Sequence, residues 1–184
     1  MIIVIFSINL RKKLMRYILL FMLSISTSLI AQQKDCFDIA RKGTVEQMIQ
    51  LYEANHDVVN SKNDFGFTPL ILACYQGNYE VATFLIKKNA DINYVSDEGT
   101  ALMAAVVKGN LELVKILLIN NANPNLTNSK GTTALMYAVQ FNNYEITKLL
   151  LEYKANKTLI NNEGKTAFEY AVFSNNEKII TLLK

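Results

Sequence analysis

Glycine recurs at nearly constant intervals through the later part of this 184-residue chain. The period is about 33 residues, and each of these glycines shortly precedes a threonine: Gly66, Gly99, Gly131 and Gly164. Alanine recurs with the same period and in the same phase: Ala73, Ala105, Ala138 and Ala171. A period of this size with helix–turn–helix content indicates a solenoid, in which each unit packs only on its neighbours.

The best-formed unit covers residues 66–93, GFTPLILACYQGNYEVATFLIKKNADIN. Thr68 is a favourable helix N-cap and Pro69 suits the first helical position, which needs no N–H donor. Gly77 can adopt the left-handed conformation that ends this helix, and Asn78 can cap a second helix at once. Two helices of roughly ten residues are marginally stable alone, so the unit is expected to stack on similar units.

The residues of this unit resemble the ankyrin repeat, most clearly Gly66-Phe67-Thr68-Pro69-Leu70 and Asn89-Ala90-Asp91-Ile92-Asn93. The resemblance covers roughly residues 35–184 and implies an all-α, ankyrin-type helix–turn–helix solenoid with short β-turn or hairpin tips. In-phase matches divide the chain into an N-terminal cap repeat, three full repeats and a C-terminal cap repeat: 35–62, 63–95, 96–127, 128–160 and 161–184.

This chain departs from the family pattern after the Thr-Pro-Leu stretch. The family has a histidine there that ties neighbouring repeats together by hydrogen bonds. The four repeats have other residues at this position: Ile71, Met103, Met136 and Glu169. We therefore expect cohesion between the repeats to depend on apolar packing.

Residues 1–31 are typical of a secretory signal peptide. Four basic residues precede an apolar run at 17–31, YILLFMLSISTSLIA, which softens into Ser and Thr and is short for a membrane span. We expect cleavage after Ala31, which leaves a mature domain of residues 32–184, exported to the periplasm or secreted. The alternative is an uncleaved anchor formed by residues 17–31. Met15 is an alternative start.

The charge distribution does not favour a nucleic-acid partner. The whole chain has 19 Lys plus Arg and 16 Asp plus Glu, but four of the basic residues lie within the segment 1–31, which has no acidic residue. The remainder is close to neutral and has no basic patch in its sequence.

No residue pattern indicates catalysis, a metal or a cofactor. His56 is the only histidine and falls in an expected loop, with no second imidazole and no nucleophile partner. Cys36 and Cys74 are offset by about five residues in the repeat phase, or about 7.5 Å of axial rise. Adding the spacing of about 8–10 Å between packed helices puts them beyond disulfide reach.

The resemblance implies that a partner binds the concave surface formed by the tips and the exposed side of the inner helices. Large or apolar residues that break the repeat pattern there are the candidate contacts: Phe65, Phe67, Tyr75, Tyr94, Val107, Lys108, Leu126, Gln140, Phe141 and Phe173. We expect them to form a contiguous stripe. The alternative is that some of them, particularly Phe141 and Phe173, fill gaps between repeats.

The sequence therefore predicts a non-enzymatic protein-binding module that acts outside the cytosol, without a cofactor and as a monomer when alone. Narrower versions are an inhibitor or immunity-like protein and an exported protein that engages a host protein. Two alternatives remain open: a membrane-tethered scaffold, with membrane contact only through an uncleaved leader, and an accessory subunit of a periplasmic enzyme.

Overall fold

The computed structural model describes residues 35–184, of which Cys36–Lys184 form one compact unit. The predicted signal peptide at residues 1–31 lies outside the described residues. The inner helices are α2 (Cys36–Lys42), α4 (Pro69–Gln76), α6 (Ala101–Val107), α8 (Ala134–Gln140) and α10 (Ala167–Phe173). The outer helices are α3 (Val45–Ala54), α5 (Tyr79–Lys87), α7 (Leu111–Ile119), α9 (Tyr144–Glu152) and α11 (Glu177–Leu183), and a short 3-10 helix, η1 (His56–Asn60), follows α3.

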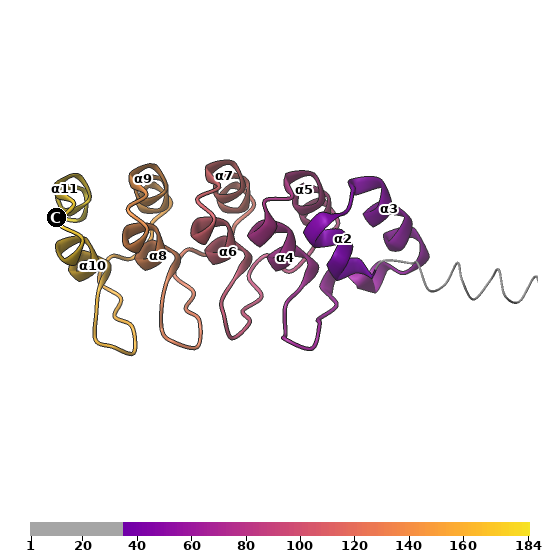
Figure 1. Ribbon diagram of the computed structural model, residues 1–184, viewed down its shortest axis with the longest axis horizontal. Coiled ribbons are helices and arrows are strands. Elements are labelled where there is room, and N and C mark those ends of the chain that lie inside the picture. The colour runs from indigo at the N-terminus through magenta and orange to yellow at the C-terminus, as the bar shows by residue number, and fades with distance from the viewer. Residues whose placement is uncertain (1–34) are drawn as a thin grey trace, which may run out of the picture. The chain divides into compact units, whose positions relative to one another are not determined.

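The helices form two parallel rows. Each inner helix contacts the next inner helix, each outer helix contacts the next outer helix, and the connecting tips project from the same side (Figure 1). Over residues 35–184 the tips contain only two isolated β-bridges, Ser96–Gly99 and Thr127–Thr133, and no strand. The same part of the chain has no helix long and apolar enough to cross a membrane. The predicted all-α solenoid is confirmed.

Two residue types begin almost every helix. Threonine caps the inner helices α4, α6, α8 and α10, and asparagine caps the outer helices α5, α7, α9 and α11, each side-chain oxygen accepting from a backbone N–H in the first turn. Such caps stabilise a helix by about 1 kcal/mol each. The predicted caps Thr68 and Asn78 are confirmed, and Gly77 ends α4 in the left-handed conformation with φ 75°.

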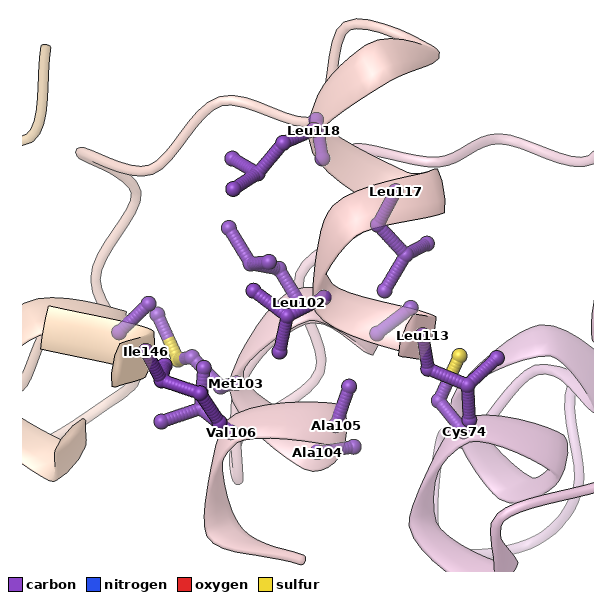
Figure 2. Close-up of a cluster of buried hydrophobic side chains, with 14 of the residues drawn as sticks. Cys74, Leu102, Met103, Ala104, Ala105, Val106, Leu113, Leu117, Leu118 and Ile146 are labelled. Carbon is purple, nitrogen blue, oxygen red and sulfur yellow. The ribbon is translucent and has the colours of Figure 1, made fainter. Parts of the chain in front are cut away.

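The core follows the repeat. Leucine, methionine, valine and alanine side chains of α6 and α7 point into a shared cluster that also holds Cys74 of α4 and Ile146 of α9 (Figure 2). The alanine that recurs in every inner helix is fully buried, which lets neighbouring inner helices approach closely. Ile71, Met103 and Met136, which replace the family's histidine, are also buried.

Asparagine side chains add polar links between the repeats. The Asn60 Oδ1 accepts from the Asp91 backbone N–H at 2.8 Å, in the following repeat. The Oδ1 atoms of Asn93 and Asn125 make the same contact with the repeats that follow them, and each accepts from a backbone N–H at 2.7 Å. The expectation of apolar cohesion is therefore incomplete, because a ladder of asparagines, which the sequence pattern did not predict, also joins the repeats.

Candidate functional site: a groove between the tips and the inner helices

An apolar groove of about 560 Å³ lies between the tips and the inner helices. The residues before α4 and before α6 supply one wall, and α4, α6 and α8 supply the floor and the other wall. The residues that line it, and that define the groove, are Arg41, Phe65, Phe67, Ile71, Leu72, Tyr75, Gln76, Ser96, Glu98, Gly99, Thr100, Met103, Ala104, Val107, Tyr137 and Phe141.

The tip before α4 is shaped by one asparagine. The Asn63 Oδ1 accepts from the backbone N–H groups of Phe65 at 3.1 Å and Phe67 at 2.9 Å. Gly66 between them has a φ of 73°, which an L-residue rarely adopts. This turn presents Phe65 to solvent, 76% exposed, while Phe67 packs partly against the core.

The far wall is held by a second asparagine and by ring stacking. The buried Asn128 donates through Nδ2 to the Tyr137 hydroxyl at 3.0 Å, and its Oδ1 accepts from the backbone of the same tip. Phe141 stacks on Tyr137 with the ring centroids 6.3 Å apart and an interplanar angle of 15°. These contacts fix two aromatic surfaces before any partner arrives, which lowers the entropy cost of binding.

A lysine lies over one of the aromatic rings that line the groove. The Lys108 Nζ lies 4.3 Å from the centroid of the Tyr75 ring, a cation–π geometry. Tyr75 belongs to α4 and Lys108 to the C-cap of α6, so the contact joins neighbouring repeats. It also places a positive charge at the helix side of the groove.

The predicted contact residues fall into two groups. Five of the ten line the groove: Phe65, Phe67, Tyr75, Val107 and Phe141. Lys108 contacts this set through Tyr75. Tyr94, Leu126, Gln140 and Phe173 lie outside the groove. The structure thus brings six of the ten residues together at the groove and leaves four outside it.

The exposure of Phe141 and Phe173 shows whether these two side chains face solvent or fill gaps between repeats. Phe141 is 52% exposed and stacks on Tyr137, so it both packs and faces the groove. Phe173 is 93% exposed, so the suggestion that it fills a gap between repeats was wrong. Tyr94 is half-buried and has the Lys62 Nζ 4.4 Å from its ring centroid.

Sequence reasoning missed most of the groove floor and the charged rim. The lining residues that it did not name as candidate contacts are Arg41, Ile71, Leu72, Gln76, Ser96, Glu98, Gly99, Thr100, Met103, Ala104 and Tyr137. A signal for the tip geometry was present, because a polar residue recurs three positions before each periodic glycine: Asn63, Ser96, Asn128 and Asn161. Each of them hydrogen-bonds backbone groups within its own tip.

Reactive side chains outside the groove have ordinary structural surroundings. His56 is exposed at the start of η1, and its ring lies edge-on to Tyr52 with the centroids 4.4 Å apart. Within residues 35–184, no group of three or more His, Cys, Asp or Glu side chains is placed to hold a metal ion.

Both cysteines are buried. Burial raises the pKa of the Cys74 thiol well above its ordinary value, which keeps the sulfur neutral and poorly nucleophilic. The Cys36 Sγ lies 3.3 Å from the Ser61 Oγ, within hydrogen-bonding distance. Neither thiol lines the groove.

Comparison with known proteins decides the family. A model of three ankyrin repeats matches residues 37–128 and again residues 102–184. The chain belongs to the ankyrin repeat family. Ankyrin repeats indicate a protein–protein interaction module, and ankyrin repeat proteins are typically non-enzymatic.

Among curated proteins, this ankyrin repeat chain is similar to human oxysterol-binding protein-related protein 1. The two are 40% identical over 67 residues, which cover 32% of this chain and 7% of the human protein. The chain thus spans a small fraction of the length of this relative, and the likeness is confined to a short stretch.

Proposed function

We propose that residues 32–184 bind a protein partner through the groove and perform no catalysis. The observation that carries the proposal is the groove itself, where tip and helix aromatics that break the repeat pattern converge on one apolar surface. Aromatic side chains in such positions are the usual energetic anchors of protein interfaces. The held geometry of Tyr137 and Phe141 favours docking of a partner without rearrangement of the repeats.

Photo-crosslinking in the cells that produce the protein tests this proposal. A benzophenone amino acid at Tyr75 is expected to capture a partner, whereas the same group at Lys115, on the exposed face of the outer helix α7, is not. Capture from Lys115 alone, or equally from both positions, would refute binding through the groove.

Substitution supplies an independent readout. The double change Phe65→Ser and Tyr75→Ser removes two exposed groove rings and leaves the half-buried Phe67 in place, so the fold is expected to persist. Affinity for the crosslinked partner is expected to fall by roughly 30-fold or more, which corresponds to the loss of at least one hot-spot aromatic worth about 2 kcal/mol. Phe173→Ser is the matched control, because Phe173 is exposed but lies outside the groove.

We further propose that the domain acts outside the cytosol, with an inhibitor or immunity-like role as the narrower version. The support is the sequence of residues 1–31, with its basic cluster followed by a short apolar run. N-terminal sequencing of protein from fractionated cells tests the location. A mature chain that begins near Gln32 in the periplasmic or secreted fraction is expected, whereas retention of residues 17–31 in the membrane fraction would indicate the tethered scaffold instead.

A further inference from the structure

The two tips beside the groove, residues 61–68 and 94–100, carry a net negative charge, because they hold three acidic side chains and one basic side chain, Lys62. Asp64, Asp97 and Glu98 occupy two neighbouring tips and are exposed. Glu98 lines the groove, Asp64 precedes the groove residue Phe65, and Asp97 follows the groove residue Ser96. The ion pairs among residues 35–184 are Arg41 with Asp38 and Lys165 with Glu163, so none of the three rim carboxylates is neutralised by a basic side chain there.

The opposite side of the groove carries the positive charge. Arg41 lines the groove but its Nη1 is paired with the Asp38 Oδ1 at 3.0 Å. Lys108 is held over the Tyr75 ring. The groove is therefore lined mainly by apolar side chains, with a net negative charge at the two tips and with the basic side chains Arg41 and Lys108 at the ends of α2 and α6.

The apolar floor of the groove favours an occupant with apolar side chains. This floor includes apolar side chains of α4 and α6, among them Leu72, Met103 and Ala104. A volume of about 560 Å³ falls within the range of roughly 300–1,000 Å³ that encloses drug-sized molecules. The groove can therefore hold more than one large side chain of a peptide segment.

We propose that the groove selects a protein segment that carries large apolar or aromatic side chains flanked by Lys or Arg, with the basic residues facing the acidic tips. This inference rests on the proposed function and names the chemistry of the partner. The apolar side chains supply most of the affinity by leaving water. The charges set the orientation of the segment and raise its rate of association, because complementary potentials act mainly on these two properties.

Selection from random peptides displayed on phage, with the full chain as target, tests the inference. We expect enrichment of sequences that combine Phe, Tyr, Leu or Met with Lys or Arg. Enrichment of acidic or uncharged sequences would overturn the inference, as would the absence of any enrichment, which is the outcome expected if the groove serves a small molecule.

Charge-neutralising variants locate the effect. Asp97→Asn combined with Glu98→Gln is expected to weaken the best selected peptide by roughly 3- to 10-fold at low salt, with a smaller difference at high salt. Glu145→Gln combined with Glu152→Gln removes the same charge from the outer helix α9 and is expected to leave affinity unchanged. Equal weakening by both double variants would contradict a local role for the tips.

The two proposals fail in different ways. If a partner crosslinks at Tyr75 but its affinity ignores the Asp97→Asn and Glu98→Gln changes, the groove is the binding site and the inference about basic residues is wrong. If no partner crosslinks at Tyr75, and the peptides selected on the full chain still bind the Phe65→Ser and Tyr75→Ser variant, the groove is not the binding site.

Discussion

Two inner helices, α8 in the interior of the stack and α10 in the last repeat, begin in the same way but differ in burial. Both follow a threonine N-cap, start with alanine, and bury a second alanine at the same position, Ala138 and Ala171. Val139 of α8 is fully buried, whereas Val172 at the same position of α10 is 51% exposed. Because the residue and its helix position are the same, the difference comes from the neighbouring repeat and not from the helix itself.

The sequence of α10 reflects this difference at one position. Met136 is buried in α8, and α10 has Glu169 at the equivalent place, exposed to solvent. The Glu169 carboxylate accepts from the backbone N–H and from the hydroxyl of Thr166, which completes a capping box. The cap of α8 has a buried thioether at this position, with the Met136 Sδ 3.5 Å from the Thr133 backbone nitrogen, whereas the cap of α10 has an exposed carboxylate.

The largest expected effect is the difference in stability between substitutions at the two valines, Val139 and Val172. Val139→Asp places an unpaired carboxylate in the core and is expected to lower the free energy of unfolding by roughly 4 kcal/mol or more. Val172→Asp is expected to cost about 1 kcal/mol or less, because its side chain already contacts water. Urea denaturation followed by circular dichroism measures both. Val139→Ala, a milder change, keeps the comparison measurable if Val139→Asp does not fold, and similar costs at both positions would contradict dependence on the neighbour.

The next largest expected effect is the difference between alanine substitutions at two glycines that have nearly the same backbone conformation. Gly131 and Gly164 have φ values of 71° and 73°, so an alanine at either site costs about 1–2 kcal/mol for the left-handed conformation. An added Cβ at Gly131 comes within 3.0 Å of the Asn162 backbone nitrogen, in the next tip, whereas at Gly164 it meets nothing within 4 Å. Gly131→Ala is therefore expected to destabilise the protein more than Gly164→Ala, as measured by thermal melting. Equal shifts in the melting temperature would show that the tips do not constrain one another.

The periodic residues allowed the fold to be predicted, since the recurring glycines, alanines and caps repeat the same local physics in each unit. The groove was only half predictable. Phe65 and Tyr75 could be identified because they break the period, but Met103 and Ala104 look like core residues in sequence. Whether a side chain at a repeated position faces the groove depends on the angle between neighbouring repeats, which no local pattern encodes.

The third comparison, with a smaller expected effect on stability, is between two asparagines, Asn125 of the ladder and Asn156. Asn125 accepts from the Asn156 backbone N–H at 2.7 Å and donates to the Lys154 carbonyl at 3.2 Å, so it bridges two repeats. The Asn156 side chain accepts only from Thr158, within its own turn. Asn125→Ala is expected to cost about 1–2 kcal/mol, since each of its two hydrogen bonds contributes roughly 0.5–1.5 kcal/mol. Asn156→Ala is expected to cost about 1 kcal/mol or less, because Asn156 is exposed and water can replace its bonds within one turn. The midpoint of urea unfolding compares them, and a larger loss for Asn156→Ala would argue that the ladder does not join the repeats.

The smallest expected effect is that of Glu169, whose carboxylate occupies the position that the buried Met136 has in α8. Hydrogen bonds from the Thr166 backbone and hydroxyl hold the pKa of Glu169 below its ordinary value. A lowered pKa in the folded state means that the charged form adds stability at neutral pH, and that this stability is lost as the pH falls through the folded pKa. Glu169→Gln is therefore expected to be slightly less stable than the unsubstituted protein near pH 7 and to approach it at lower pH. Urea midpoints measured from about pH 7 to about pH 3, a range that spans the ordinary carboxyl pKa, test this. A difference that stays constant over that range would mean that Glu169 caps α10 through its shape alone and that its charge contributes nothing.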